Sequence, residues 1–248
     1  MAWVQTDSLS FSARHESEDA EAAVAILDEL EDFRDLLGEV FDELPGEVSV
    51  VIHARPGALA LAHPWLPLAR VLAAPAARRY MAGWFAQDEI HVLGPEALGE
   101  RAARVEGSHE ALRLSPLHEY AHLVIGANNP ELPPPFTFRT FARYMRWAWL
   151  CEGAATHFAG QAPHLRAAIA RRLREGPRPS FPPDARDAPL LGATVFRLLE
   201  SGRGARACAE LASGRLSKSG PRPTIERAFE RQFSDVERAW RESLEGHQ

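Results

Sequence analysis

Residues 115–126 read SPLHEYAHLVIG and form the segment around which the rest of the chain is best interpreted. Ser115 followed by Pro116 is typical of a helix start, with serine as the N-cap and proline in the first turn. Apolar residues occupy most of the following positions, and Gly126 is typical of a helix end. The segment therefore predicts a largely buried helix that carries two histidines and a glutamate near its middle.

Three of these residues, His118, Glu119 and His122, have the spacing of an HExxH motif. Positions four residues apart lie about 40° apart around a helix axis, so both imidazoles can bind one metal ion. Glu119 projects in a neighbouring direction, where its carboxylate can act as a general base without binding the ion. Buried histidine and glutamate side chains are costly unless they are paired, and a shared zinc ion would satisfy all three. The alternative interpretation is a solvated helix face with two histidines.

A catalytic zinc ion usually has three protein ligands, so a third ligand is required. The metzincin pattern would place glycine at position 125 and histidine at position 128, but Ile125 and Asn128 stand there. Glu152 is a single acidic residue in an apolar stretch rich in small residues, and a metal ion is the natural partner of a lone buried carboxylate. We therefore predict Glu152 as the third ligand, with Glu131 in a proline-rich loop as its competitor.

With these motifs the chain resembles the gluzincin metallopeptidases, and among them a group of small bacterial peptidase-MA-like domains. Such domains combine an HExxH helix with a later helix that reads roughly W-L-x-E-G-x-A, and residues 149–155 match that pattern. The resemblance covers most of the chain, since the expected strands, long helix and hairpin before the motif follow the same order. Gly192, Phe196 and Trp240 fit positions in the helices that come later.

The resemblance implies a zincin-like fold with one Zn²⁺ ion per chain, bound by His118, His122 and Glu152. It implies that Glu119 is the general base and later the proton shuttle in the hydrolysis of a peptide bond. It also implies that the hairpin strand at residues 90–93 is the sheet edge beside the cleft, where an extended peptide can add as a strand. The expected partner is a peptide or protein substrate.

Three positions depart from the pattern of this family. Thr156 stands where many gluzincins keep an aspartate that holds a ligand histidine, while His157 and Pro189 stand where tyrosines are frequent. The group that stabilises the tetrahedral oxyanion is therefore open. His157 and Tyr144 are the two candidates, and simple packing is the alternative explanation for each.

The N-terminal half predicts strands that alternate with a helix. Residues 8–13 alternate between serines and apolar side chains, as in a half-buried strand. Ser17 is a candidate N-cap for a long amphipathic helix that ends at Gly38. Residues 48–52 are predicted as a central strand, and residues 55–77 as an irregular region with short helix. Residues 80–85 and 90–93 are predicted as the two strands of a β-hairpin.

The C-terminal half predicts helices alone. Strand signals stop after Gly94, and a last helix opens at Ser234 with Glu237 at the spacing of a capping box. The other helical patterns cover residues 138–160, 163–174 and 188–200.

The predicted fold class is α+β. We expect an N-terminal lobe at residues 1–126, with a small mixed sheet and the HExxH helix. A helical C-terminal lobe at residues 127–248 would supply Glu152, and the cleft would lie between the two lobes.

The composition excludes several classes of function. The 248 residues are 46% hydrophobic, which is enough for a sizeable core, and the net charge of −6 argues against nucleic-acid binding. Cys151 and Cys208 make no disulfide framework. The first residues lack the features of a secretory signal, and the most apolar stretch, residues 58–77, contains prolines that no unassisted membrane span would carry. We expect a cytoplasmic protein with no membrane partner.

The expected function is that of a zinc metallopeptidase, and two alternatives remain. A zinc-binding module without catalysis would fit the departures at positions 156, 157 and 189. A structural protein without metal would make the motif a coincidence. The lack of an aminopeptidase-type GxMEN stretch before residue 115 favours an endopeptidase or oligopeptidase.

Overall fold

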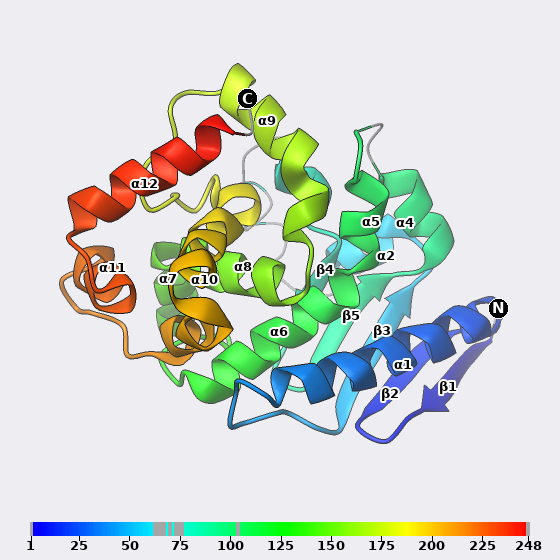
Figure 1. Ribbon diagram of the computed structural model, residues 1–248. Coiled ribbons are helices and arrows are strands. Elements are labelled where there is room, and N and C mark those ends of the chain that lie inside the picture. Colours follow the sequence, from blue (N-terminus) through cyan, green and yellow to red (C-terminus); the bar gives the residue numbers. More distant parts are fainter. Residues whose placement is uncertain (1, 62–67, 69–70, 72–76, 103–104, 247–248) are drawn as a thin grey trace.

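The computed structural model describes residues 2–246, apart from residues 62–67, 69–70, 72–76 and 103–104. Its architecture is mixed α/β, with a five-stranded sheet in the N-terminal half and helices in the C-terminal half. In Figure 1 the strands and helix α1 (Ala20–Leu37) lie on one side of the molecule, and helices α8 (Ala148–Phe158) and α10 (Ala188–Ser213) lie on the other. Helix α6 (Ser115–Asn128), which carries the motif, packs against both α1 and α8.

The strands of the sheet are β1 (Trp3–Asp7), β2 (Phe11–Glu16), β3 (Val48–His53), β4 (Gly83–Phe85) and β5 (Glu89–Leu93). Their order across the sheet is β1-β2-β3-β5-β4. The inner pairs β2–β3 and β3–β5 are parallel, and the outer pairs β1–β2 and β4–β5 are antiparallel. The prediction of a central strand at residues 48–52 is therefore confirmed, and the sheet is mixed as expected.

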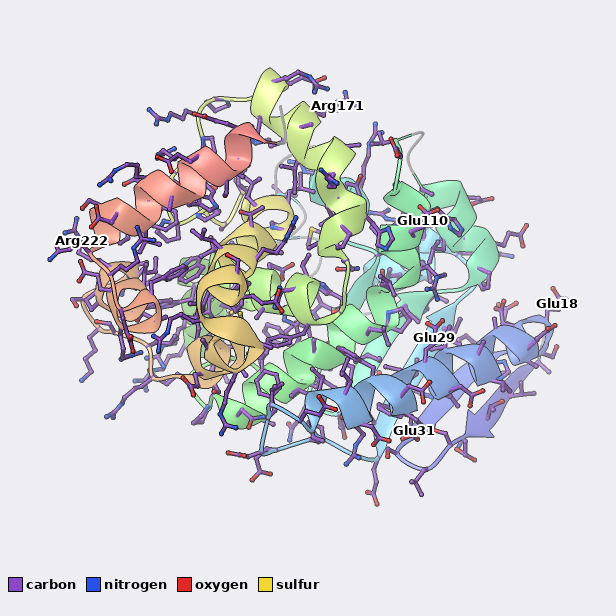
Figure 2. All side chains as sticks on the ribbon, in the orientation of Figure 1. Glu18, Glu29, Glu31, Glu110, Arg171 and Arg222 are labelled. Carbon is purple, nitrogen blue, oxygen red and sulfur yellow. The ribbon has the colours of Figure 1, made fainter. Side chains whose placement is uncertain are left out.

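The strand predicted at residues 8–13 is wrong at its start. Residues 8–10 form the turn between β1, which was not predicted, and β2. The hydroxyl of Ser8 and the main-chain N–H of Ser10 both donate to the carboxylate of Glu31, at 2.7 and 2.6 Å. Glu31 projects from α1 (Figure 2), so the serines bind this helix instead of lining a face of the sheet.

The predicted hairpin is confirmed, but its first strand is shorter than predicted and its second strand begins one residue earlier. Tyr80 is the last residue of the 3₁₀ helix η2 (Ala77–Tyr80), and residues 81–82 form no regular structure before β4 begins at Gly83. The expectation that residues 90–93 form the sheet edge is wrong, because β5 pairs with β3 on one side and with β4 on the other. The edge strand is β4. Of the region predicted as irregular, helix α2 (Pro56–Leu61) is described, and most of residues 62–76 lie outside the described residues.

The helical half is confirmed, with different divisions. The single helix predicted at residues 138–160 is interrupted at Trp147, whose backbone dihedrals (φ −113°, ψ 22°) are not helical. The helix predicted at residues 188–200 continues to Ser213 through a kink at Gly204, where φ is 80°. The remaining helices are α4 (Pro95–Arg101), α5 (Ser108–Arg113), α7 (Phe138–Arg146), η3 (Ala162–Leu165), α9 (Arg166–Glu175), α11 (Pro221–Phe229) and α12 (Phe233–Glu245).

The predicted helix caps are wrong, although the helices themselves form. The 3₁₀ helix η1 (Ser17–Asp19) precedes α1, so Ser17 is not its N-cap. Ser115 is the first residue of α6, and its hydroxyl donates to the carbonyl of Leu112 at 2.6 Å. Ser234 lies inside α12, which begins at Phe233 without a side-chain cap.

The main hydrophobic core includes buried residues from both halves of the chain. Tyr120 of α6 packs edge-on against Phe11 of β2, with ring centroids 5.0 Å apart. Helices α8 and α10 approach closely, since a Cβ atom added to Gly153 would lie 2.6 Å from the carbonyl carbon of Gly192. Among the described residues, no helix combines the length and hydropathy that crossing a membrane requires.

Candidate metal centre

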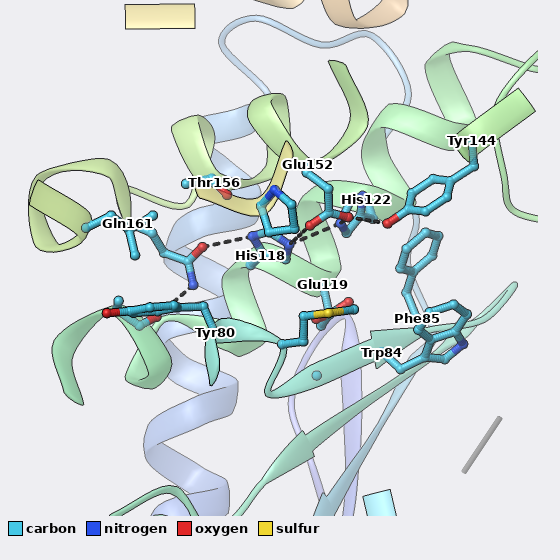
Figure 3. Close-up of a pocket in the computed structure, with 15 residues that line it drawn as sticks. Tyr80, Trp84, Phe85, His118, Glu119, His122, Tyr144, Glu152, Thr156 and Gln161 are labelled. Atoms are coloured by element: carbon cyan, nitrogen blue, oxygen red, sulfur yellow. Dashed lines mark hydrogen bonds and ion pairs between the residues drawn. The ribbon is translucent and has the colours of Figure 1, made fainter. Parts of the chain in front are cut away.

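Two histidines of α6 and one glutamate of α8 converge at the site (Figure 3). The Nε2 atoms of His118 and His122 are 3.1 Å apart. One carboxylate oxygen of Glu152 lies 3.7 Å from Nε2 of His118, and the other lies 3.3 Å from Nε2 of His122. Among the described residues, these three form the group of histidine, cysteine and acidic side chains that could hold a metal ion.

Local structure explains why these side chains meet. The helical spacing of the motif places both imidazoles on the same side of α6, one turn apart. Glu152 reaches them from α8, which packs against α6 on one side and against α10 on the other. Gly153 and Gly192 allow this close packing of α8 and α10, because neither has a side chain at the point of contact.

The spacing of the three donor groups fits a tetrahedral zinc ion. Bonds of about 2.0–2.1 Å in tetrahedral geometry place neighbouring ligand atoms about 3.3 Å apart. The two imidazole nitrogens are 3.1 Å apart, and they lie 3.3 and 3.7 Å from two different oxygens of Glu152, so the three side chains are near this spacing. Two imidazoles and one carboxylate also form one of the known donor sets of catalytic zinc, which leaves the fourth position open.

Burial and mutual interaction control the charges at the site. Burial opposes ionisation of Glu152, but its interaction with the imidazoles of His118 and His122 outweighs burial and holds the pKa of this carboxyl well below its usual range. Burial lowers the pKa of His122. The cluster therefore presents a carboxylate to two imidazole nitrogens, as a bound cation requires.

Glu119 occupies a separate position beside the three ligand residues. Its side chain lies against the backbone of β4 at Gly83 and is 6% exposed (Figure 3). Burial raises the pKa of Glu119 to about 8. A carboxyl with a pKa near neutrality is suited to accept a proton and release it again.

The two candidates for oxyanion stabilisation are in different places. Tyr144 of α7 lines the site, and its hydroxyl donates a short hydrogen bond to Glu152. Burial raises the pKa of Tyr144 well above its ordinary value, so the phenol keeps its proton. His157 lines another cavity, of about 410 Å³, where its Nε2 atom is 3.8 Å from Glu200. The structure therefore brings Tyr144, and not His157, to the ligand residues.

The competitor for the third ligand also lies elsewhere. Glu131 pairs with Arg143 at 3.0 Å and accepts a hydrogen bond from the main-chain N–H of Leu216 at 3.2 Å. Cys151, next to Glu152 in sequence, is buried in the main core.

Sequence reasoning missed Gln161, which lies in the loop after α8. Its side-chain Oε1 is 2.8 Å from Nδ1 of His118, and its Nε2 donates to the carbonyl of Ala111 at 2.7 Å. No spacing rule connects position 161 with position 118, so the sequence carries no signal for this contact.

The cavity at the site is small, with a volume of about 30 Å³. Tyr80 and Met81 on the side of the sheet and Leu165 and Pro189 on the helical side are among the residues that line it. The position predicted as a departure from the gluzincin pattern, Pro189, thus lies at the wall of the site.

Comparison of the chain with protein-family models, with curated proteins and with solved structures gives no match. The functional assignment consequently depends on the residues of the site and their geometry.

Proposed function

We propose that this protein is a zinc-dependent metallopeptidase of the gluzincin type with a zincin-like arrangement. The observation that carries the proposal is the convergence of His118, His122 and Glu152 from two helices at the separations of zinc ligands, with Glu119 beside them. One ion per chain would be held by these three residues. The order of the motifs along the chain supports the same assignment.

Each residue of the site has a role in the proposed hydrolysis. When bound, zinc would supply Lewis acidity, which lowers the pKa of a water molecule and polarises the scissile carbonyl. Glu119 takes the proton of the attacking water and delivers it to the leaving amine nitrogen. Tyr144, whose hydroxyl donates to Glu152 in this structure, would turn that hydroxyl toward the developing oxyanion.

Strand β4 is the proposed binding edge for an extended peptide. Among the described residues it is the last strand of the sheet on this side, and Gly83 and Phe85 line the site together with the motif helix. An edge strand offers main-chain N–H and C=O groups that can pair with a peptide backbone without a fixed sequence. A peptide or protein substrate is therefore the proposed partner.

Metal content measured by elemental mass spectrometry tests the metal site. We expect about one zinc per chain in the wild type and a loss of zinc in His118→Ala and in Glu152→Ala. Glu131→Ala is the matched control, because it removes a carboxylate that lies outside the site. Zinc retained in Glu152→Ala and lost in Glu131→Ala would contradict the ligand set, and no zinc after reconstitution would contradict the proposal.

A peptide-library screen tests the activity. Glu119→Gln should retain zinc and lose hydrolysis, because it removes the base without removing a ligand. The second candidate function is a zinc-binding module without catalysis, which the positions of Thr156, His157 and Pro189 and the small cavity favour. Stoichiometric zinc without turnover on any library member would support that candidate.

A further inference from the structure

We propose that Gln161 is a positioning residue that fixes the tautomer and orientation of His118 for metal binding. This inference rests on the proposed function, since it concerns one of the three proposed ligands. Gln161 is buried at the end of the segment that follows α8, and its side chain connects α6 with the carbonyl of Ala111 in α5 (Figure 3).

The direction of the two hydrogen bonds follows from elementary chemistry. The carbonyl of Ala111 can only accept, so the atom of Gln161 that lies 2.7 Å from it must be the amide nitrogen. The amide oxygen of Gln161 therefore faces Nδ1 of His118, at 2.8 Å. An amide oxygen only accepts, so Nδ1 of His118 must carry the hydrogen.

The consequence of this tautomer lies at the other ring nitrogen. With the hydrogen on Nδ1, neutral His118 keeps a lone pair on Nε2, the atom that faces His122 and Glu152. Histidines that bind a metal almost always donate their other ring N–H to an acceptor, which holds the ring in place. Gln161 supplies that acceptor as a neutral amide, where a carboxylate would add negative charge.

The position of Gln161 is itself held by the backbone. Its main-chain N–H donates to the carbonyl of Thr156 at 3.1 Å, which closes the turn after α8. The same helix carries Glu152, so α8 and its C-terminal turn supply both a ligand and the group that orients a second ligand on α6.

Three variants test this role through zinc affinity, measured by competition with a chelator. Gln161→Met keeps the length of the side chain and removes both hydrogen bonds, and it should weaken zinc binding roughly 10- to 100-fold. Gln161→Glu keeps an acceptor for Nδ1–H and should bind zinc at least as tightly as the wild type. Thr194→Val is the matched control, because it removes a buried hydrogen bond, from Trp240 at 2.7 Å, far along the chain from the motif. It should leave zinc affinity unchanged.

Nitrogen-15 NMR of the metal-free protein reports which ring nitrogen of His118 carries the hydrogen. A purely structural role of Gln161 would not change this tautomer. His118 should have its hydrogen on Nδ1 in the wild type and in Gln161→Glu, and should lose this preference in Gln161→Met. Wild-type zinc affinity or an unchanged tautomer in Gln161→Met would overturn the proposal, as would equal weakening in Gln161→Glu or Thr194→Val. If the wild type binds no zinc, the proposed function fails, while the NMR comparison still decides the role of Gln161.

Discussion

The backbone of Gly83 lies directly against the carboxylate of Glu119. A Cβ atom added to Gly83 would be 2.4 Å from Oε1 of Glu119 and 2.6 Å from its Cγ. No real Cβ contact is that short, so the edge strand and the proposed base can adopt this arrangement only with glycine at position 83.

Gly83→Ala should therefore displace Glu119 and reduce kcat/KM by roughly 100-fold, while zinc remains bound. The matched control is Gly99→Ala in α4, where an added Cβ meets nothing within 4 Å. Kinetics and metal content of both variants check this expectation. Wild-type kcat/KM in Gly83→Ala would show that the position of Glu119 is not critical.

The contact of α8 with α10 should be equally sensitive. A Cβ at position 192 would lie 2.7 Å from the carbonyl oxygen of Trp149 and 2.8 Å from Cα of Gly153. We expect Gly192→Ala to lower the free energy of unfolding by about 1–3 kcal/mol, because the helices must separate. It should also weaken zinc binding, since α8 carries Glu152. Gly202→Ala in the same helix meets nothing within 4 Å and should be neutral in urea denaturation. Equal effects of the two substitutions would argue against the close contact.

The different positions of Tyr144 and His157 lead to a paired prediction. Tyr144→Phe should lower kcat by about 100-fold, which is the typical loss on removing an oxyanion donor, and should leave zinc stoichiometric. His157→Ala should leave kcat within a few-fold of the wild type, since His157 lines a different cavity. Steady-state kinetics with one peptide substrate compares them, and the reverse ranking would return His157 as the candidate.

A pH dependence of stability should come from a histidine pair on the sheet. Nε2 of His53 is 3.0 Å from Nδ1 of His91, and burial followed by the proximity of His91 lowers the pKa of His53 from 6.5 to about 4. Between these pH values the unfolded chain binds a proton that the folded protein does not bind. The free energy of unfolding should therefore fall as the pH decreases from about 6.5 to about 4, and this slope should stop below about 4.

Urea denaturation across this pH range, with His53→Gln as the variant, checks the prediction. His53→Gln should reduce the slope, whereas His109→Gln, which replaces an exposed histidine, should not change it. An identical slope in His53→Gln and the wild type would assign the pH dependence to other groups.

The cluster of His118, His122 and Glu152 could be predicted because its chemistry is visible in local sequence. His118 and His122 are four residues apart, so their side chains point in the same direction when the segment is helical. Glu152 stands out as an acidic residue among apolar neighbours. The helix around residues 115–126 and the strand at residues 48–52 were predictable for a similar reason, since both are strongly apolar segments.

The remaining features depend on contacts between distant segments. The turn at residues 8–10 is held by Glu31, which lies far along the chain. Strand β4 lies at the edge because β5 pairs with β3. The helix break at Trp147 has no proline or glycine to mark it in the sequence. Cap residues were predicted from Ser115 and Ser234, but serine hydroxyls can also donate to a carbonyl one turn earlier, as Ser115 does. Gln161 meets His118 only after α8 has packed against α6.

The volume of about 30 Å³ at the site is room for about one or two water molecules. A peptide backbone needs more room than this, so substrate binding would require the walls of the site to move apart. The rate of turnover would then be limited by the opening of the site, in which Tyr80 on the sheet side and Pro189 on the helical side move apart. This step would precede the chemical reaction. Conditions that loosen this contact without unfolding the protein, such as mild warming or dilute urea, would accelerate hydrolysis before they abolish it.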